Sequence, residues 1–187
     1  MAKDNHQLLT FTLGSEVYAM EVATTREVLE FTGLTPIPRM PNWIRGVLNL
    51  RGTVIPVLDL KQKLGMGRTE QSRDSCILIL ELSLNGEQTI VGILADSVRE
   101  VFEIEHAQIE PPPRFGSQIS TEYLRGVGHR NETLFILLDV QKIFAINELT
   151  LAEATAQATE AAAIEFATSA ANASAAEASN HNELPRQ

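Results

Sequence analysis

The chain has 187 residues, of which 44% are hydrophobic and one is cysteine, so it can bury a core as one compact unit or two closely packed ones without disulfides. The formal net charge of −9 is divided unevenly: residues from Glu148 onward carry six acids and one arginine, and the rest carries 18 acids and 14 bases. A mildly acidic body with interspersed signs argues against nucleic acid or an anionic lipid surface as the main partner.

The N-terminal residues contain no apolar run that would form a signal peptide, and no segment has the roughly 18 to 20 apolar residues of a membrane helix. We therefore expect a cytoplasmic protein without direct membrane insertion.

The first predicted element is a hairpin. Leu9, Phe11 and Leu13 alternate with polar residues, Gly14-Ser15 is a turn signal, and the strand 17–20 follows.

Further strands are predicted where short β-branched or alternating apolar runs occur, at 46–50, 53–58, 77–84, 89–94 and 133–140. Asn85-Gly86 separates two of these runs and strongly favours a tight hairpin, because both residues of such a turn need positive φ. Prolines at 36, 38, 41 and 111–113 mark connections. The pattern indicates an all-β fold of barrels or a sandwich.

Three short motifs recur in the same order: Arg26–Glu30 and Arg99–Glu103, Leu50–Gly52 and Leu124–Gly126, and Val57–Lys61 and Leu137–Gln141. Their offsets are 73, 74 and 80 residues. Ordered recurrence predicts a duplication, with two similar β units at about 7–70 and 75–147 that share one domain, 7–147. Neither unit is large enough to have an independent core.

The composition changes after Asn147. Residues 148–187 are rich in alanine and have few large apolar side chains. Alanine favours helix, but little apolar surface is available for docking, so we expect a tail that is partly helical and then disordered.

No pattern typical of an enzyme is present. The four histidines, at 6, 106, 129 and 181, have no partners at metal-ligand spacing, and Gly65-Met66-Gly67 is a turn rather than a dinucleotide loop. The sequence contains neither a nucleophile elbow nor a phosphate loop. Cys76 lies in an apolar run that predicts a buried, inert thiol. We expect no catalysis, no cofactor and no metal.

The most distinctive segment is Pro41–Leu60, in which two predicted strands flank Asn49-Leu50-Arg51-Gly52. Gly52 favours a turn and leaves Arg51 at the end of an apolar ladder. An arginine placed there pairs with a carboxylate, contacts a partner, or lies in solvent at the turn tip, because burying it alone costs several kcal/mol.

This segment resembles the signature of CheW-like domains. The stretches 11–14 with 18–20, 91–98 and 119–128 resemble the opening, middle and late parts of the same family, in order, from about Gln7 to Asn147. The resemblance implies two SH3-like β-barrels packed together with short helices, which agrees with the duplication. The tail departs from the short C-terminal helix usual in the family.

The resemblance implies a non-catalytic adaptor that couples the helical hairpin tips of chemoreceptors to the regulatory domain of the histidine kinase CheA. By position, Glu27 and Arg51 match a charged pair associated with a receptor-binding groove between the barrels. Five further positions match residues that line or support that region: Thr25, Gly46, Ile77, Gly92 and Val101. Thr25 is the poorest match, since an aliphatic residue suits an apolar groove better.

Two alternatives keep the CheW-like domain, and a third belongs to another class of protein. A coupling protein of another chemosensory array, such as one controlling pilus motility, would have the same sequence features. A CheV-type protein would need a receiver domain, for which 187 residues leave no room. A β-barrel that binds nucleic acid would need a basic, aromatic face, and only 5% of the residues are aromatic.

Overall fold

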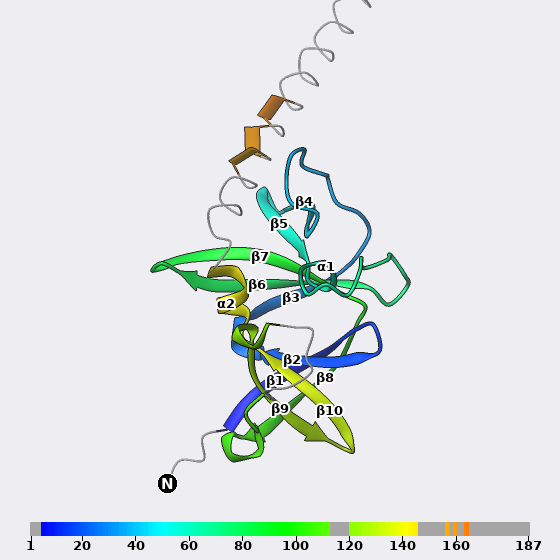
Figure 1. Ribbon diagram of the computed structural model, residues 1–187. Coiled ribbons are helices and arrows are strands. Elements are labelled where there is room, and N and C mark those ends of the chain that lie inside the picture. Colours follow the sequence, from blue (N-terminus) through cyan, green and yellow to red (C-terminus); the bar gives the residue numbers. More distant parts are fainter. Residues whose placement is uncertain (1–4, 113–119, 146–155, 158, 161–162, 165–187) are drawn as a thin grey trace, which may run out of the picture.

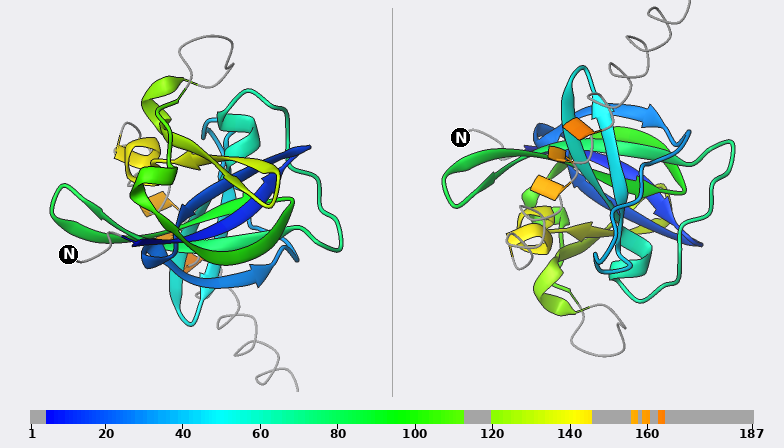
Figure 2. Two further views of the ribbon diagram at one scale, coloured as in Figure 1. Left: turned by 90° about the horizontal axis from the view of Figure 1, so that it is seen from below. Right: turned by 90° about the horizontal axis from the view of Figure 1, so that it is seen from above.

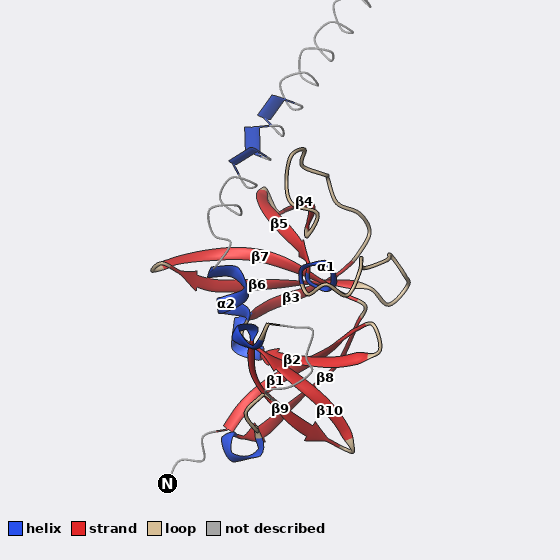
Figure 3. Cartoon of the chain, in the orientation of Figure 1, coloured by secondary structure: helices blue, strands red, loops and turns tan. Residues whose placement is uncertain are grey.

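The computed structural model describes residues 5–112 and 120–145, together with 156–157, 159–160 and 163–164. Ten strands dominate this part of the chain (Figures 1 and 3): β1 Asn5–Leu13, β2 Glu16–Glu21, β3 Thr25–Glu30, β4 Ile44–Leu50, β5 Thr53–Asp59, β6 Cys76–Leu84, β7 Glu87–Ala95, β8 Ser97–Glu105, β9 Leu124–Arg130 and β10 Thr133–Leu138. The helices are short: η1 Val22–Thr24, α1 Leu60–Lys63, η2 His106–Gln108, η3 Thr121–Tyr123 and α2 Val140–Ala145. None of the described helices is long and apolar enough to cross a membrane.

The strands form two five-stranded sheets with matching topology. Sheet A has the order β8-β1-β2-β10-β9, and sheet B has the order β3-β6-β7-β5-β4. In each, an antiparallel hairpin lies at the centre, an antiparallel strand flanks one side, and a second hairpin joins the other side through a parallel pair. The all-β prediction with two similar units is therefore confirmed.

The two sheets are stacked, with sheet B above sheet A in Figure 1. In Figure 2, sheet A is nearest the viewer on the left, seen from below, and sheet B is nearest on the right, seen from above. Neither sheet closes into a complete barrel. In each sheet, one isolated bridge joins the chain that follows one edge strand to the opposite edge strand. In sheet B, Thr35 after β3 pairs with Val47 of β4, and in sheet A, Glu110 after β8 pairs with Val127 of β9. Gly46 permits the first approach, since a Cβ there would lie 2.4 Å from the Thr35 carbonyl oxygen.

Each sheet draws strands from both repeats, so the predicted units at about 7–70 and 75–147 do not coincide with the sheets. The hairpin β1–β2 joins the later strands β8, β9 and β10, and the hairpin β6–β7 joins the earlier strands β3, β4 and β5. The sequence repeat corresponds to a hairpin, three strands and a helix, and the hairpins are exchanged. Exchange buries both faces of each hairpin, which neither repeat could do alone.

One predicted repeat pair was wrong. Arg26–Glu30 and Arg99–Glu103 do lie on equivalent edge strands, β3 and β8. However, Leu124–Gly126 begins β9 and corresponds to Ile44–Gly46, which begins β4, at an offset of 80. Leu50–Gly52 lies at the other end of β4. The short Leu-Arg-Gly motif matched by chance, whereas the backbone hydrogen bonds of Asp59 to Trp43 and of Asp139 to Tyr123 repeat at the true offset.

Five predicted strands agree with β4, β5, β6, β7 and β10, although residue 140 begins α2 instead of ending a strand. The turn between β6 and β7 is as predicted, with φ of 47° at Asn85 and 84° at Gly86. Strands β3, β8 and β9 were not predicted, because their mixed charged and apolar residues give a weak alternation. The predicted tail, 148–187, lies outside the described residues except at 156–157, 159–160 and 163–164, which are helical.

The core has three parts. One cluster fills the interior of sheet A, a second fills the interior of sheet B, and the largest lies between the sheets. Because successive side chains of a strand point to opposite faces, one strand contributes to two of these clusters. In β6, Ile77 and Ile79 face the interior of sheet B, and Leu78 and Leu80 face the shared core. The shared core explains why two small sheets are stable together.

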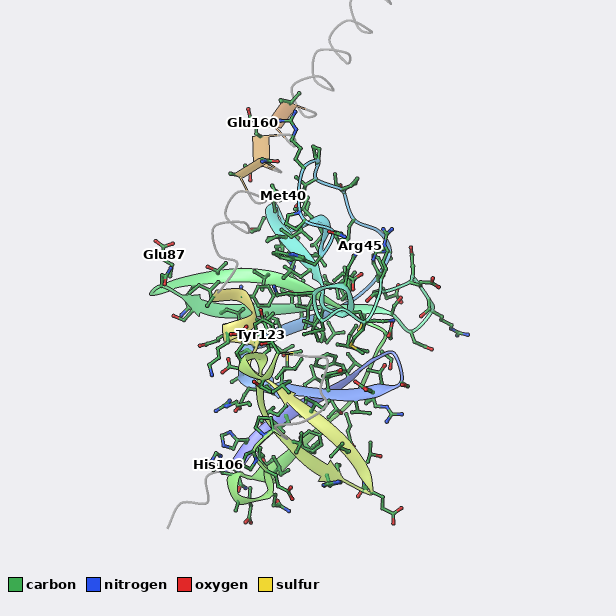
Figure 4. All side chains as sticks on the ribbon, viewed as in Figure 1. Met40, Arg45, Glu87, His106, Tyr123 and Glu160 are labelled. Atoms are coloured by element: carbon green, nitrogen blue, oxygen red, sulfur yellow. The ribbon has the colours of Figure 1, made fainter. Side chains whose placement is uncertain are left out.

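The sheets are also joined by a cation between two aromatic rings. The Lys63 ammonium lies 4.4 Å from the centre of the Trp43 ring and 5.8 Å from that of the Tyr123 ring. Figure 4 labels Tyr123 at the level where the sheets meet. Trp43 and Tyr123 precede the equivalent strands β4 and β9. Partial burial lowers the pKa of Lys63, so the ring contacts offset some of its desolvation.

Candidate binding surfaces

A groove runs between the two edges of sheet B, where β3 and β4 approach without pairing. We call it the sheet B groove, and its volume is about 750 Å³. It is lined by residues of β3, the chain after it, β4 and β6: Leu29, Glu30, Thr32, Gly33, Leu34, Thr35, Val47, Leu48, Asn49, Leu50 and Ile77. Much of this lining is apolar and only partly buried, so the interior of sheet B is open along this line.

Arg51 and Glu27 lie at one end of the sheet B groove. The Arg51 Nη2 donates to Glu27 Oε2 at 3.3 Å, and an adjoining hollow of about 500 Å³ is lined by both side chains together with Leu50, Ile55 and Ile79 among others. The pair joins β3 to the turn after β4. It therefore spans the two unpaired edges of one sheet.

The local chain positions Arg51 in a strained turn. Arg51 and Gly52 both have positive φ, 52° and 87°, and the Asn49 side chain accepts a hydrogen bond from the Gly52 amide at 2.9 Å. The Arg51 side chain is 79% exposed and that of Glu27 28% exposed. A pair this exposed contributes little to stability, about 0 to 1 kcal/mol, and leaves most of the guanidinium available to a partner.

The expectation that Arg51 and Glu27 lie in a groove between the barrels was wrong. Every residue that lines the hollow around them belongs to sheet B or to its turns. The physical reason is that β3, β4 and β5 of one repeat pair around the β6–β7 hairpin, so that β3 and the β4–β5 turn lie at the two edges of one sheet.

A separate intersheet groove of about 610 Å³ does lie between the sheets. Its lining comes from β3, the start of β6 and β8: Val28, Asp74, Cys76, Ser97, Val98 and Arg99. Val28 is 46% exposed, and Val101, further along β8, is 54% exposed. The two valines occupy equivalent positions on equivalent edge strands.

Val28 and Arg99 were missed as site residues from the sequence. The repeat contained a usable signal, because the offset of 73 that relates Arg26 to Arg99 also relates Val28 to Val101. What the sequence lacked was the side on which each valine points. That depends on the bulge that each edge strand makes near its arginine, between Thr25 and Glu27 and opposite Leu9 and Phe11.

The remaining predicted site residues lie mostly inside sheet B. Ile77 is 2% exposed and lines the floor of the sheet B groove. Gly92 is buried beside it, and a Cβ there would lie 2.9 Å from a Val57 methyl and 3.0 Å from one of Ile77. Thr25 is half-buried at the start of β3, with its hydroxyl 3.9 Å from the Met20 sulfur. These residues shape the surface, whereas Val101 belongs to sheet A.

A buried polar network supports the β4–β5 hairpin from behind. Asp59 is fully buried, and its carboxylate accepts hydrogen bonds from Arg45 Nη1 at 2.7 Å and from the Thr69 amide and hydroxyl at 2.8 Å. Arg45 also donates to the Thr69 carbonyl and lies over the Phe31 ring; Figure 4 labels it beside β4. The network is satisfied internally, which indicates a structural role.

Within the described residues, no group of three or more His, Cys, Asp or Glu side chains is arranged to hold a metal ion. Burial raises the pKa of Cys76 to about 11, so the neutral, unreactive thiol predominates at neutral pH. The described surface is thus organised around apolar grooves and exposed charges.

Comparison with known proteins agrees with this organisation. The model of the CheW-like domain matches residues 7–148. The chain is 33% identical over 151 residues to a chemotaxis protein CheW of Klebsiella aerogenes, covering 81% of this chain and 89% of that one. It is also 33% identical over 144 residues to the protein FrzA of Myxococcus xanthus, covering 76% of this chain and 87% of the relative.

A solved structure gives the same result for the fold. The crystal structure of the scaffolding protein TtCheW from Thermoanaerobacter tengcongensis is 34% identical in sequence, with a TM-score of 0.67 over 74% of this chain and 87% of that one. The family model, the sequence relatives and the solved structure cover the same two-sheet region. The chain belongs to the family of CheW-like domain proteins.

Proposed function

We propose that this chain is a non-catalytic adaptor that couples chemoreceptors to the histidine kinase CheA in chemotaxis signalling. The observation that carries the proposal is the match to the CheW-like domain over residues 7–148, together with similarity to chemotaxis proteins named CheW and to a scaffolding CheW structure. An adaptor needs at least two surfaces that can be occupied together. The sheet B groove and the intersheet groove are lined by different residues, which supports the proposal.

For the receptor, we propose contacts from Arg51 and Glu27 of sheet B and from Val101 of sheet A, with Thr25 near Glu27 on β3 as a further contact. The valine side chain supplies apolar area for a helical hairpin. Arg51 supplies a charge-assisted hydrogen bond, and Glu27 holds the guanidinium in place at 3.3 Å. Few anchors are needed, because interfaces of about 800 Å² per partner derive most of their affinity from a small number of residues.

The buried members of the proposed site act through shape. Gly46 and Gly92 allow close approach of neighbouring chains where a side chain would collide, and Ile77 fills the floor between them. A larger residue at either glycine would displace the walls of the sheet B groove. We therefore assign Gly46, Ile77 and Gly92 as supporting residues of the receptor site.

Reconstitution of the ternary complex tests the proposal. The full chain should co-purify with CheA and with receptors from its own cell, and it should raise receptor control of kinase autophosphorylation in membranes. Binding to neither protein would contradict the adaptor assignment. The type of array is decided by the same experiment, since the similarity to CheW and to FrzA is equal at 33% and does not distinguish them.

A further inference from the structure

A polar cluster at the far end of sheet A takes no part in the proposed adaptor surfaces. His6 lies near the start of β1, and Glu21 ends β2. His106 begins η2 after β8, and Arg125 lies near the start of β9. Figure 4 shows His106 at the opposite end of the molecule from β4 and β5. Four segments distant in sequence thus bring two imidazoles, a carboxylate and a guanidinium together.

The contacts in this cluster form a chain. Arg125 Nη1 donates to Glu21 Oε1 at 2.7 Å, and the same oxygen lies 2.9 Å from His6 Nδ1. The other nitrogen of that ring, Nε2, lies 3.3 Å from Nδ1 of His106. An ionised carboxylate can only accept a hydrogen bond, so Nδ1 of His6 carries a proton, and in the neutral ring Nε2 then presents its lone pair toward His106.

This arrangement is the one that proteins use to prepare a histidine for metal. A ligating histidine almost always donates its second ring N–H to a carboxylate, a backbone carbonyl or water, which fixes the tautomer and raises the basicity of the other nitrogen. Here Glu21 supplies that carboxylate and Arg125 holds it. The side chains of His6 and Glu21 are 18% and 24% exposed, so the orientation is supported by packing, while the cluster is open to ions from solvent.

The spacing of the two nitrogens also fits. Two nitrogens at 2.0 to 2.1 Å from a tetrahedral zinc ion are about 3.3 to 3.4 Å apart, and His6 Nε2 and His106 Nδ1 are 3.3 Å apart. The ring planes are inclined by 44°, and His106 is exposed, so a small rotation of its ring can aim both lone pairs at one point.

We propose that His6 and His106 form a two-histidine site for a divalent transition ion of the Zn²⁺, Cu²⁺ or Ni²⁺ class. Imidazole nitrogen suits these ions, whereas Mg²⁺ and Ca²⁺ select oxygen ligands. Because the described residues offer no group of three protein ligands, water completes the coordination, and binding is reversible and not a condition of folding. The ion clamps the start of β1 to the chain after β8, beside the cross-strand pair His6 and Ile104.

The test is a calorimetric titration of the tag-free, chelator-treated full chain with Zn²⁺ at pH 7.5, with Mg²⁺ as the second probe. We expect saturable binding of one Zn²⁺ and no heat from Mg²⁺. His106→Gln and His6→Gln should each weaken Zn²⁺ binding by about 10-fold or more, and Glu21→Ala by about 10-fold to 100-fold through loss of the tautomer control.

His129→Gln is the matched control, because His129 is an exposed histidine of the same sheet outside the cluster. It should bind Zn²⁺ like the unchanged chain, as should His181→Gln in the tail. Circular dichroism melting verifies that each variant is folded. If His6→Gln does not fold, the exposed His106→Gln variant decides. Absence of saturable Zn²⁺ binding, or binding that His106→Gln leaves unchanged, would show that the two rings share only a hydrogen bond and would overturn the proposal.

Discussion

Sheets A and B have the same strand order and directions but differ in how their interiors are filled. In sheet A the interior is closed by aromatic rings: Phe102 and Phe135 pack edge to face at 5.5 Å and are 6% and 1% exposed. The equivalent positions of sheet B hold Leu29 and Ile55. The interior there is bordered by partly buried side chains, Leu29, Leu34, Leu48, Leu50 and Ile90.

The two sheets also differ in the residue that lies opposite Phe135 or its equivalent in sheet B, Ile55. In sheet A, Gly128 lies opposite Phe135, and a Cβ there would come within 2.5 Å of the ring. In sheet B, the equivalent pair is Leu48 opposite Ile55, and Leu48 is half-buried on the wall of the sheet B groove. One copy of the duplicated sheet thus gained packing, and the other retained an apolar opening. The topology is compatible with both, so the side chains decide which copy is suited to bind a partner.

The largest expected effect is on stability and separates the two interiors. Phe135→Ala should lower the free energy of unfolding by about 3 to 5 kcal/mol, because a fully buried ring leaves a cavity that its neighbours cannot fill. Leu48→Ala in sheet B should lower it by about 1 kcal/mol, since the leucine is partly exposed on the wall of the sheet B groove. Urea unfolding measures both, and equal losses would mean that sheet B is as tightly packed as sheet A.

The next effect concerns the core shared by the sheets and depends on pH. Burial raises the pKa of Cys76 from 9.0 in the unfolded chain to about 11 in the folded one. The resulting stability is present in full below pH 9 and is lost as pH rises through about 11, because the unfolded thiol gives up its proton first. Cys76→Ala should therefore lose less stability between pH 8 and 11 than the unchanged chain.

The loss attributable to Cys76 is at most about 3 kcal/mol. Urea unfolding at pH 8 and at pH 10.5 measures it. Burial also raises the pKa of Tyr18, but Tyr18 is present in both proteins, so its contribution to the pH dependence cancels when the two are compared. Parallel pH profiles would show that the Cys76 thiol ionises as readily in the folded chain as in the unfolded one.

A third effect tests the binding role of sheet B. Arg51→Ala should weaken receptor binding by about 10-fold to 150-fold, the equivalent of one charge-assisted hydrogen bond worth roughly 1.5 to 3 kcal/mol, while CheA binding suffers less. Glu27→Ala should give a similar defect, and the double variant should be less than additive because the two groups act as a pair.

Melting temperatures of the same variants supply the control. Arg51 is 79% exposed, so stability should barely change. A purely structural bridge would instead lower the melting temperature and weaken both partners in parallel. Receptor binding that Arg51→Ala leaves unchanged would refute the assignment of Arg51 to the receptor site.

The smallest effect concerns the arginine that covers sheet A. The Arg130 guanidinium lies 4.8 Å from the centre of the Phe102 ring, a cation–π contact worth about 0.5 to 1 kcal/mol at an exposed site. Arg130→Ala should lower the melting temperature by about 1 to 4 °C and leave receptor and CheA binding intact. A binding defect without a change in melting temperature would show that Arg130 contacts a partner directly.

The sequence by itself determined the all-β class, the duplication, the hairpin at Asn85-Gly86 and the family. These depend on local patterns: alternation of apolar residues, positive φ at a turn, and motifs that recur in order. The pairing of Glu27 with Arg51 was also anticipated, although by resemblance. Weakly alternating edge strands such as β3 and β9 were not, because exposed edges impose little pattern on the sequence.

Only the tertiary structure decided which strands share a sheet, and hence where the grooves lie. Pairing of β3, β4 and β5 around the exchanged β6–β7 hairpin placed Arg51 and Glu27 at the two edges of sheet B, and pairing of β8 with β1 placed Val101 in sheet A. Strand pairing between distant segments depends on which apolar faces can be buried together, and no local sequence pattern encodes it. For the same reason the contact between His6 and His106, which are 100 residues apart, is visible only in the folded chain.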